Sequence, residues 1–222
     1  VAEGQGKRLW LCSLFNKICF GDLVARYSVR NDMALKILIR KLAESVKQPS
    51  SFTRLANLVS STGKKITTDT IIDYLNYLED TWILFPLENY VSKLADKVSN
   101  KKFYFMDNGI LSLFLMDPET SLLENLVAVT LKKRYGDALY FYHRNIEVDF
   151  YLDEGHKAIQ VSYSLKDPET RKREVNALLK LAENVAVDDL CIITRDEEEM
   201  IVEGEKTIRV VPVWRWLLDD EG

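Results

Sequence analysis

The feature that most constrains this chain is a pair of extended runs, Ile146 to Leu152 and Lys157 to Tyr163, joined by the turn residues Asp153-Glu154-Gly155. In the first run polar and apolar residues alternate, as in a strand with one buried face. The two runs therefore predict an antiparallel hairpin. One acid of the first run, Asp149, and one amide of the second, Gln160, then point toward a common place.

A third polar group, Glu124, falls on the helix that we expect from about Ser121 to Tyr135. An acid from a helix and an acid from a strand can hold one Mg²⁺ or Mn²⁺, because hard cations prefer oxygen ligands. On this hypothesis Asp149 is the central metal ligand and Glu124 the second, while Gln160 lends its amide oxygen. The hairpin and the helix thus predict a candidate catalytic and metal site.

Ser162 lies at the position that decides whether such a site could work. In metal-dependent nucleases of the restriction-endonuclease-like fold, this slot of the second strand carries Glu-x-Lys, where the acid binds the metal and the lysine steadies the attacking water. Here the slot reads Gln160-x-Ser162, and a serine hydroxyl supplies no positive charge. A working site would need a cation from another position, for which the candidates are Lys157, Lys166, Arg144 and His143. We therefore predict a degenerate nuclease site.

The same residues also have structural interpretations. Ser121 and Glu124 have the S-x-x-E spacing of a capping box, so Glu124 could bind the first amides of its own helix. Glu147 and Asp149 alternate on one strand face, as on any exposed polar strand. Arg144 would then be an ion-pair partner for one of these acids. From the sequence alone, these alternatives stay open.

Size and composition restrict the class of protein. With 222 residues, 47% of them hydrophobic, the chain can form two modest domains, each with a core. No apolar run approaches the roughly 18 residues that span a bilayer, and the start lacks a signal-peptide pattern. The three cysteines show no metal-ligand spacing and suit a reducing compartment. We expect a cytoplasmic protein without membrane contact, whose thiols are buried or idle.

The first half of the chain predicts a helical linker over residues 1–30 and a winged helix-turn-helix over residues 31–106. The linker shows apolar residues at helical spacing from Arg8 to about Tyr27, interrupted near Gly21. The expected order is three short helices followed by a two-stranded ribbon, which is the order of a winged helix. The first helix is about 33–47, with Asn31 or Asp32 as its cap, and Ser50-Ser51 opens a short second one. The third runs from the Thr67-Thr68-Asp69 cap to about Asp80, and the extended runs are 82–90 and 103–105.

Charge gives this half two candidate roles. Residues 1–106 hold 16 Lys and Arg against 10 Asp and Glu, and DNA binding would place lysines on phosphates. The lysines in question are Lys64 and Lys65 before the third helix and Lys93, Lys97, Lys101 and Lys102 on the wing. The solvent side of the third helix instead offers Asp69, Asp73, Asn76, Tyr77 and Glu79. Because groove-reading helices usually present basic or amide side chains, this surface favours a structural or protein-binding role.

The second half, residues 107–222, changes to alternating helices and strands after the turn signal Asp107-Asn108-Gly109. We expect the order helix, three strands, helix, strand, which is the αβββαβ core of a restriction-endonuclease-like domain with a mixed sheet. The second of these helices opens with an Asp167 cap and Pro168 at its first position. The acid run that starts at Asp196 is typical of a solvated loop. The predicted fold class is thus α+β in two domains.

Several short sequence segments resemble the C-terminal portion of a large prokaryotic family of AAA-type ATP-binding proteins. They are Asp22 to Tyr27, Thr70 to Asp80, Lys102 to Gly109, Leu123 to Val127, Glu147 to Phe150 and Gln160 to Leu165. In that family an ATPase domain precedes a winged helix and an uncharacterised domain that looks like a restriction-endonuclease fold. The resemblance implies that the ATPase domain is missing here, and that ATP would bind only through it. Residues 1–30 would then be either the linker to that domain or its last remnant. Many members have Glu-Val-Lys where this chain has Gln160-Val161-Ser162.

Three hypotheses about function follow. The first is a regulatory and interaction region that couples an ATPase to a partner, either a protein or DNA, without catalysis of its own. The second is a metal-dependent nuclease whose site has been rearranged. The third is an oligomerisation module in which exposed aromatics, Trp214 and Trp216, or the first helix bury against a neighbouring subunit. The chain has no P-loop pattern that would let it bind a nucleotide itself.

Overall fold

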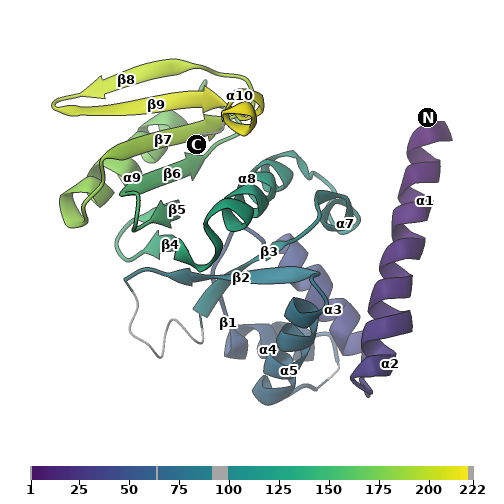
Figure 1. Ribbon diagram of the computed structural model, residues 1–222. Helices are drawn as coiled ribbons and strands as arrows, with labels where there is room; N and C mark the ends of the chain where they lie inside the picture. The colour runs from purple at the N-terminus through teal and green to yellow at the C-terminus, as the bar shows by residue number, and fades with distance from the viewer. Residues whose placement is uncertain (1, 64, 92–99, 220–222) are drawn as a thin grey trace. The chain divides into compact units, whose positions relative to one another are not determined.

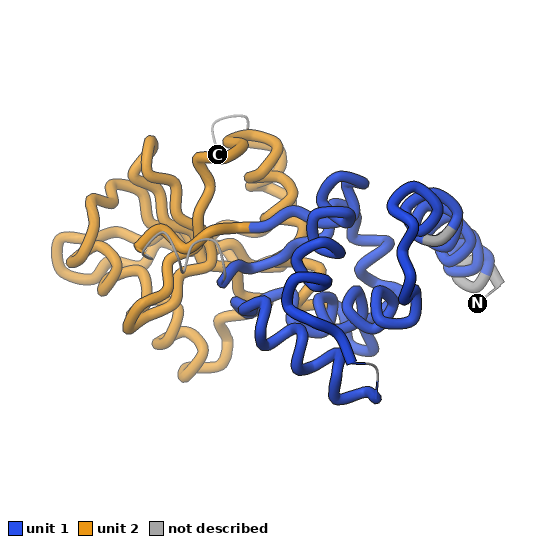
Figure 2. Tube along the Cα trace, turned by 90° about the horizontal axis from the view of Figure 1, so that it is seen from below, with its two compact units in different colours: residues 1–86, 99–118 blue, residues 87–98, 119–222 orange. Residues whose placement is uncertain are grey.

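The computed structural model describes residues 2–63, 65–91 and 100–219, and the chain divides into two compact units (Figures 1 and 2). Unit 1 comprises residues 1–86 and 99–118, and unit 2 comprises residues 87–98 and 119–222. Strand β2 (Leu84–Asn89) begins in unit 1 and ends in unit 2. The expected class, α+β with a large mixed sheet, is confirmed. No helix among the described residues is long and apolar enough to cross a membrane.

Unit 1 opens with a helix that widens where the sequence suggested a break. Helix α1 (Ala2–Asn16) continues into a π-helical segment, η1 (Lys17–Leu23), and a short α2 (Val24–Arg26). Gly21 lies inside the π-helical segment, so the chain there is distorted but not broken. Phe15, Cys19 and Leu23 are buried along this segment. Burial raises the pKa of the Cys19 thiol to about 12, which fits an idle thiol.

Three capped helices follow, as the sequence predicted. They are α3 (Asp32–Glu44), α4 (Phe52–Ser60) and α5 (Thr68–Asp80), with a two-residue strand β1 (Ser50–Ser51) before α4. The side chains of Asn31, Ser51 and Thr67 each accept a hydrogen bond from the amide three residues on. These caps satisfy amides that would otherwise lack a partner at the helix start. Each helix then turns its apolar face inward.

In unit 1, strand β3 (Asn100–Phe105) pairs antiparallel with β1 and lies between β1 and β2 in the sheet. The expected turn at Asp107-Asn108-Gly109 is instead the start of helix α7 (Asn108–Ser112), where the Asp107 carboxylate caps the amide of Ile110 at 2.8 Å. A Cβ atom added at Gly109 would lie 3.3 Å from a Leu11 methyl group. The glycine therefore permits the close approach of α7 to α1.

Unit 2 is built on a mixed sheet with the strand order β2-β4-β5-β6-β7-β9-β8. The strands are β4 (Leu139–His143), β5 (Glu147–Leu152), β6 (Lys157–Val161), β7 (Asp189–Thr194), β8 (Glu199–Glu203) and β9 (Lys206–Pro212). The helices are α8 (Glu119–Tyr135), α9 (Pro168–Asn184) and α10 (Val213–Leu218), and a 3₁₀ turn, η2 (Gly136–Ala138), follows α8. Strand β8 was not expected from the sequence, and Glu199, the last acid of the run Asp196 to Glu199 that was expected in a loop, opens this strand.

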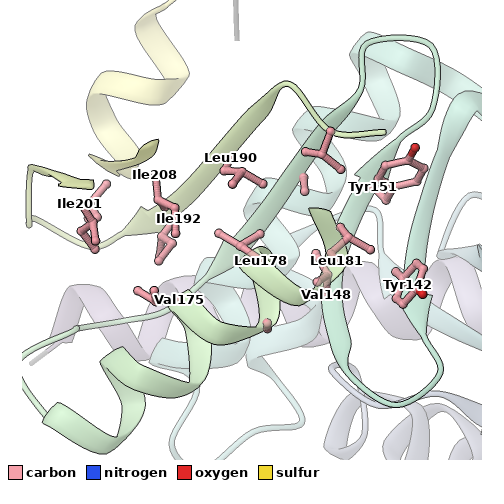
Figure 3. Close-up of a cluster of buried hydrophobic side chains, with 14 of the residues drawn as sticks. Tyr142, Val148, Tyr151, Val175, Leu178, Leu181, Leu190, Ile192, Ile201 and Ile208 are labelled. Carbon is pink, nitrogen blue, oxygen red and sulfur yellow. The ribbon is translucent and has the colours of Figure 1, made fainter. Parts of the chain in front are cut away.

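The core of unit 2 lies between α9 and the sheet (Figure 3). Val175 and Leu178 of α9 pack in one cluster with Val148 of β5, Leu190 of β7 and Ile208 of β9. Parallel pairing of β6 with β7 and of β7 with β9 brings these strands beneath a single helix. The packing fixes α9 against β5 and β6, where the candidate site lies.

Candidate functional site

Asp149 lies in a β-bulge of strand β5. The register between β4 and β5 shifts between the pairs Tyr140–Tyr151 and Tyr142–Val148, so one β4 residue faces two residues of β5. Bulges bend a strand, re-aim its side chains and often border functional sites. The bulge gives Asp149 a position that simple alternation along the strand would not predict.

Side chains replace the regular strand ladder between Asp149 and Gln160. The amide of Asp149 donates to Gln160 Oε1 at 2.7 Å, and the amide of Val161 donates to Asp149 Oδ2 at 3.0 Å. Backbone pairing of β5 with β6 runs from Leu152 and Lys157 to Phe150 and Ile159. The hairpin thus brings Asp149 and Gln160 together as the sequence predicted, and each side chain closes a gap in the other strand's hydrogen bonding.

Glu174 of helix α9 is the third member of this group. It is 6% exposed, and its Oε2 accepts a hydrogen bond from Gln160 Nε2 at 2.7 Å. Its other oxygen accepts two bonds from the Arg173 guanidinium, at 3.1 Å from Nε and 2.6 Å from Nη2. Burial, assisted by the negative charge of Asp149, raises the pKa of Glu174, while Arg173 and Gln160 oppose the rise.

Sequence reasoning missed Glu174 and Arg173, although one signal was present. Glu174 lies four residues before Leu178 and seven before Leu181, and both leucines are fully buried. At helical spacing these three positions share one face, so the acid had to point toward the sheet. The cation beside the acids comes from Arg173, not from the four positions named as candidates in the sequence. Helix α9, which follows the hairpin, therefore supplies the positive charge that is missing at Ser162.

Both ends of the Gln160 carboxamide are hydrogen-bonded inside the protein. Besides its bonds to Asp149 and Glu174, its Nε2 donates to the Glu147 carbonyl at 3.3 Å, and the side chain is 5% exposed. A cation bound through Gln160 Oε1 would have to share this oxygen with the Asp149 amide. Among residues 2–63, 65–91 and 100–219, no three His, Cys, Asp or Glu side chains form a group that could hold a metal ion. In this arrangement the donor set suits a buried hydrogen-bond network better than a metal.

Ser162 also bonds within the protein. Its side chain is buried, its Oγ donates to the Ser164 carbonyl at 3.1 Å, and its amide donates to the Ile193 carbonyl at 3.0 Å. Arg144 and Lys166 are exposed. Because the partners of Ser162 are other residues, the network Asp149–Gln160–Glu174–Arg173 joins β5, β6 and α9 without it.

Glu124 lies on α8, a different helix from the one that carries Glu174. It is 3% exposed, and α8 packs against β4 and β6. Helix α8 begins at Glu119, two residues before Ser121, so Ser121 is inside the helix and cannot be its N-cap. The capping-box interpretation of Glu124 is therefore wrong. The roles of Glu124 and Asp149 as metal ligands stay predictions.

The predicted nucleic-acid lysines differ in accessibility. Lys64, Lys93 and Lys97 lie outside the described residues. Lys65 is exposed, Lys101 is half-buried and Lys102 is fully buried. In this structure a phosphate could reach Lys65 and Lys101 but not Lys102.

The comparisons with known proteins identify a family. The model of the family described as "Domain of unknown function (DUF8612)" matches residues 2–121, which is more than half of the chain. The chain belongs to this family. The matched DUF8612 region contains the whole described part of unit 1 and ends three residues beyond it, so the network around Gln160 lies outside it.

Two relatives of this DUF8612 chain carry no functional description. This chain is 32% identical over 213 residues to "Uncharacterized protein MJ1544" of Methanocaldococcus jannaschii, and the match covers 90% of this chain and 48% of the relative. It is 24% identical over 222 residues to an "Uncharacterized protein" of Haemophilus influenzae, covering 98% of this chain and 54% of the relative. The chain thus spans about half the length of both relatives. No solved structure matches it.

Proposed function

We propose that this chain is a regulatory and interaction region of an AAA-type ATPase, and that it performs no catalysis of its own. Relatives about twice as long are compatible with a further domain in the same polypeptide. In this arrangement the chain would couple the ATPase to a partner, and ATP would bind only to the other domain. The segments that resemble the AAA-type family carry this part of the proposal.

Unit 1 takes the role of a winged helix in this proposal. Its order α3, β1, α4, α5, β2, β3 with β1 beside β3 supports that assignment. Helix α5, which would enter a DNA groove, carries the acids Asp69, Asp73, Glu79 and Asp80 and no Lys or Arg. A polyanion is repelled by such a surface, so we favour a protein partner over DNA.

Unit 2 takes the role of a degenerate restriction-endonuclease-like domain. The order α8, β4, β5, β6, α9, β7 agrees with an αβββαβ core, and the strands of this core are adjacent in the sheet. The observation that carries the absence of catalysis is the commitment of Gln160, whose carboxamide bonds to β5 and α9. A group that holds the core together is a poor ligand for a reacting centre, because binding there would cost the bonds it already makes.

The experiment is a cleavage assay on plasmid and single-stranded DNA and on RNA, with Mn²⁺ or Mg²⁺. We expect the wild-type chain and its Asp149→Ala variant to give the same background. Ser162→Ala serves as a matched control, since it alters a neighbouring buried polar group outside the network. Metal-dependent cleavage by the wild type that is lost in Asp149→Ala would overturn the proposal. It would favour a nuclease with a rearranged site, and loss of that cleavage in Arg173→Gln would place Arg173 in the role left vacant by Ser162.

A further inference from the structure

A groove in unit 1 runs between α1 and α3. Its volume is about 400 Å³, and its walls include Cys12 of α1, Met33 and Ile37 of α3, and Phe114 after α7. The Phe114 ring packs edge-on against Phe15, with the ring centroids 5.2 Å apart. Ligand pockets commonly measure about 300–1,000 Å³, so this groove has room for a few side chains. We call it the α1–α3 groove.

The rim of the α1–α3 groove is basic and partly apolar. Lys36 and Arg40 lie one turn apart on α3, and both line the groove. Lys36 pairs with Asp32 at 3.3 Å, whereas Arg40 makes no ion pair within the described part of the chain. Met33 is 48% exposed at the same helix face. A fitting occupant therefore has an apolar stripe with acids beside it.

Helix α10 of unit 2 has the apolar stripe with a neighbouring acid that such an occupant needs. On α10 the side chains of Trp214, Leu217 and Leu218 are 57%, 36% and 74% exposed. Their spacing of i, i+3 and i+4 puts them on one helix face, as in helices that dock into grooves. The next residue, Asp219, is an exposed acid, so a negative charge directly follows the apolar stripe.

We infer that α10 of one copy of this chain docks into the α1–α3 groove of a second copy. The apolar side chains would enter the groove, and the carboxylate of Asp219, directly after Leu218, would face Lys36 and Arg40. The contact is heterologous, because it joins two different surfaces. Every copy carries both surfaces, so the contact can pass from one molecule to the next. The inference goes beyond the proposed function and does not depend on the network around Gln160.

The test is sedimentation velocity of the whole chain over a range of concentrations, at low and at high salt. We expect concentration-dependent association that high salt weakens, because the rim charges are exposed. Trp214→Ala on the helix side and Met33→Glu on the groove side should each weaken association by about 30-fold or more, as for truncated hot-spot residues. Trp82→Ala removes another exposed aromatic side chain, 75% exposed, and should leave association unchanged.

A mixing experiment separates head-to-tail docking from symmetric pairing. Trp214→Ala and Met33→Glu should each be monomeric alone, yet form a one-to-one dimer when mixed, because each keeps the surface that the other lacks. If α10 paired with α10, Met33→Glu alone would still associate. If grooves paired with each other, Trp214→Ala alone would still associate. Either result, or a wild type that stays monomeric at every concentration, would overturn the inference. Circular dichroism of each variant checks that the fold is retained.

Discussion

At the scale of single residues, Glu174 is a carboxyl group in a place where its charge is poorly solvated. Burial raises its pKa above the ordinary 4.5, so the folded protein binds a proton more tightly than the unfolded chain does. The stabilisation from this proton is complete below about 4.5 and is lost as pH rises through the pKa of the folded state. Glu174→Gln removes the titration. We therefore expect the free energy of unfolding of the wild type, relative to this variant, to fall as pH increases from about 4.5 toward neutrality.

Urea unfolding at a series of pH values measures this difference. Glu183→Gln, which removes an exposed acid from the same helix, controls for the loss of one negative charge. If the curves of the wild type and Glu174→Gln ran parallel over the whole range, the raised pKa would be refuted.

The residues of the site were only partly predictable. The hairpin was predictable from its two extended runs and the turn residues between them, and pairing of these runs brings Asp149 and Gln160 close together. The bulge at Asp149 was not predictable, since no residue there is a glycine or proline that would mark it. Glu174 could have been found from its place on the apolar stripe of α9. Its contact with Gln160 was not predictable, because helical spacing shows which face an acid shares but not which strand residues it meets.

At the scale of elements, the short helix α10 places one tryptophan on its buried face and another on its exposed face. Trp216 is 4% exposed, with the Arg134 guanidinium 5.2 Å from its ring centroid, whereas Trp214 is 57% exposed. The expectation that both were exposed is therefore wrong for Trp216. We expect Trp216→Ala to lower the free energy of unfolding by about 3–5 kcal/mol. Trp214→Ala should change it by no more than about 0.5 kcal/mol.

Chemical denaturation followed by circular dichroism measures both variants on the same scale, without relying on tryptophan fluorescence. Equal destabilisation by the two substitutions would contradict the assignment of inner and outer faces to α10. It would also remove the basis for using Trp214→Ala as a surface variant in association experiments.

Elements with strong local signals were predictable, and those that depend on distant partners were not. Asn31, Ser51, Thr67 and Asp167 were readable as helix caps because capping uses residues within one turn. Strand β8 was missed because its residues Glu199 to Glu203 are mostly exposed and acidic at both ends. It is a strand through its pairing with β9, which only the folded chain supplies.

At the scale of the whole molecule, charge separates a protein partner from DNA. The ring of Tyr27 stacks on Tyr77 of α5 with centroids 4.0 Å apart, and the Tyr27 hydroxyl donates to Asp80 at 3.1 Å. Helix α5 is thus acidic and partly covered, although it is the helix that would enter a DNA groove. We expect no more than weak binding of a labelled DNA duplex in fluorescence anisotropy at about 50 mM salt.

Variants at the accessible lysines test whether these side chains contact phosphate. Lys65→Gln and Lys101→Gln should leave the weak anisotropy signal unchanged, and exposed Lys47→Gln is a matched control within unit 1. Tight binding that falls steeply between about 50 and 200 mM salt, and that weakens in Lys65→Gln or Lys101→Gln but not in the control, would instead establish a phosphate-contacting surface. Such a result would move the partner from protein to DNA while leaving the closed network of unit 2 unaffected, because that network and these lysines lie in different units.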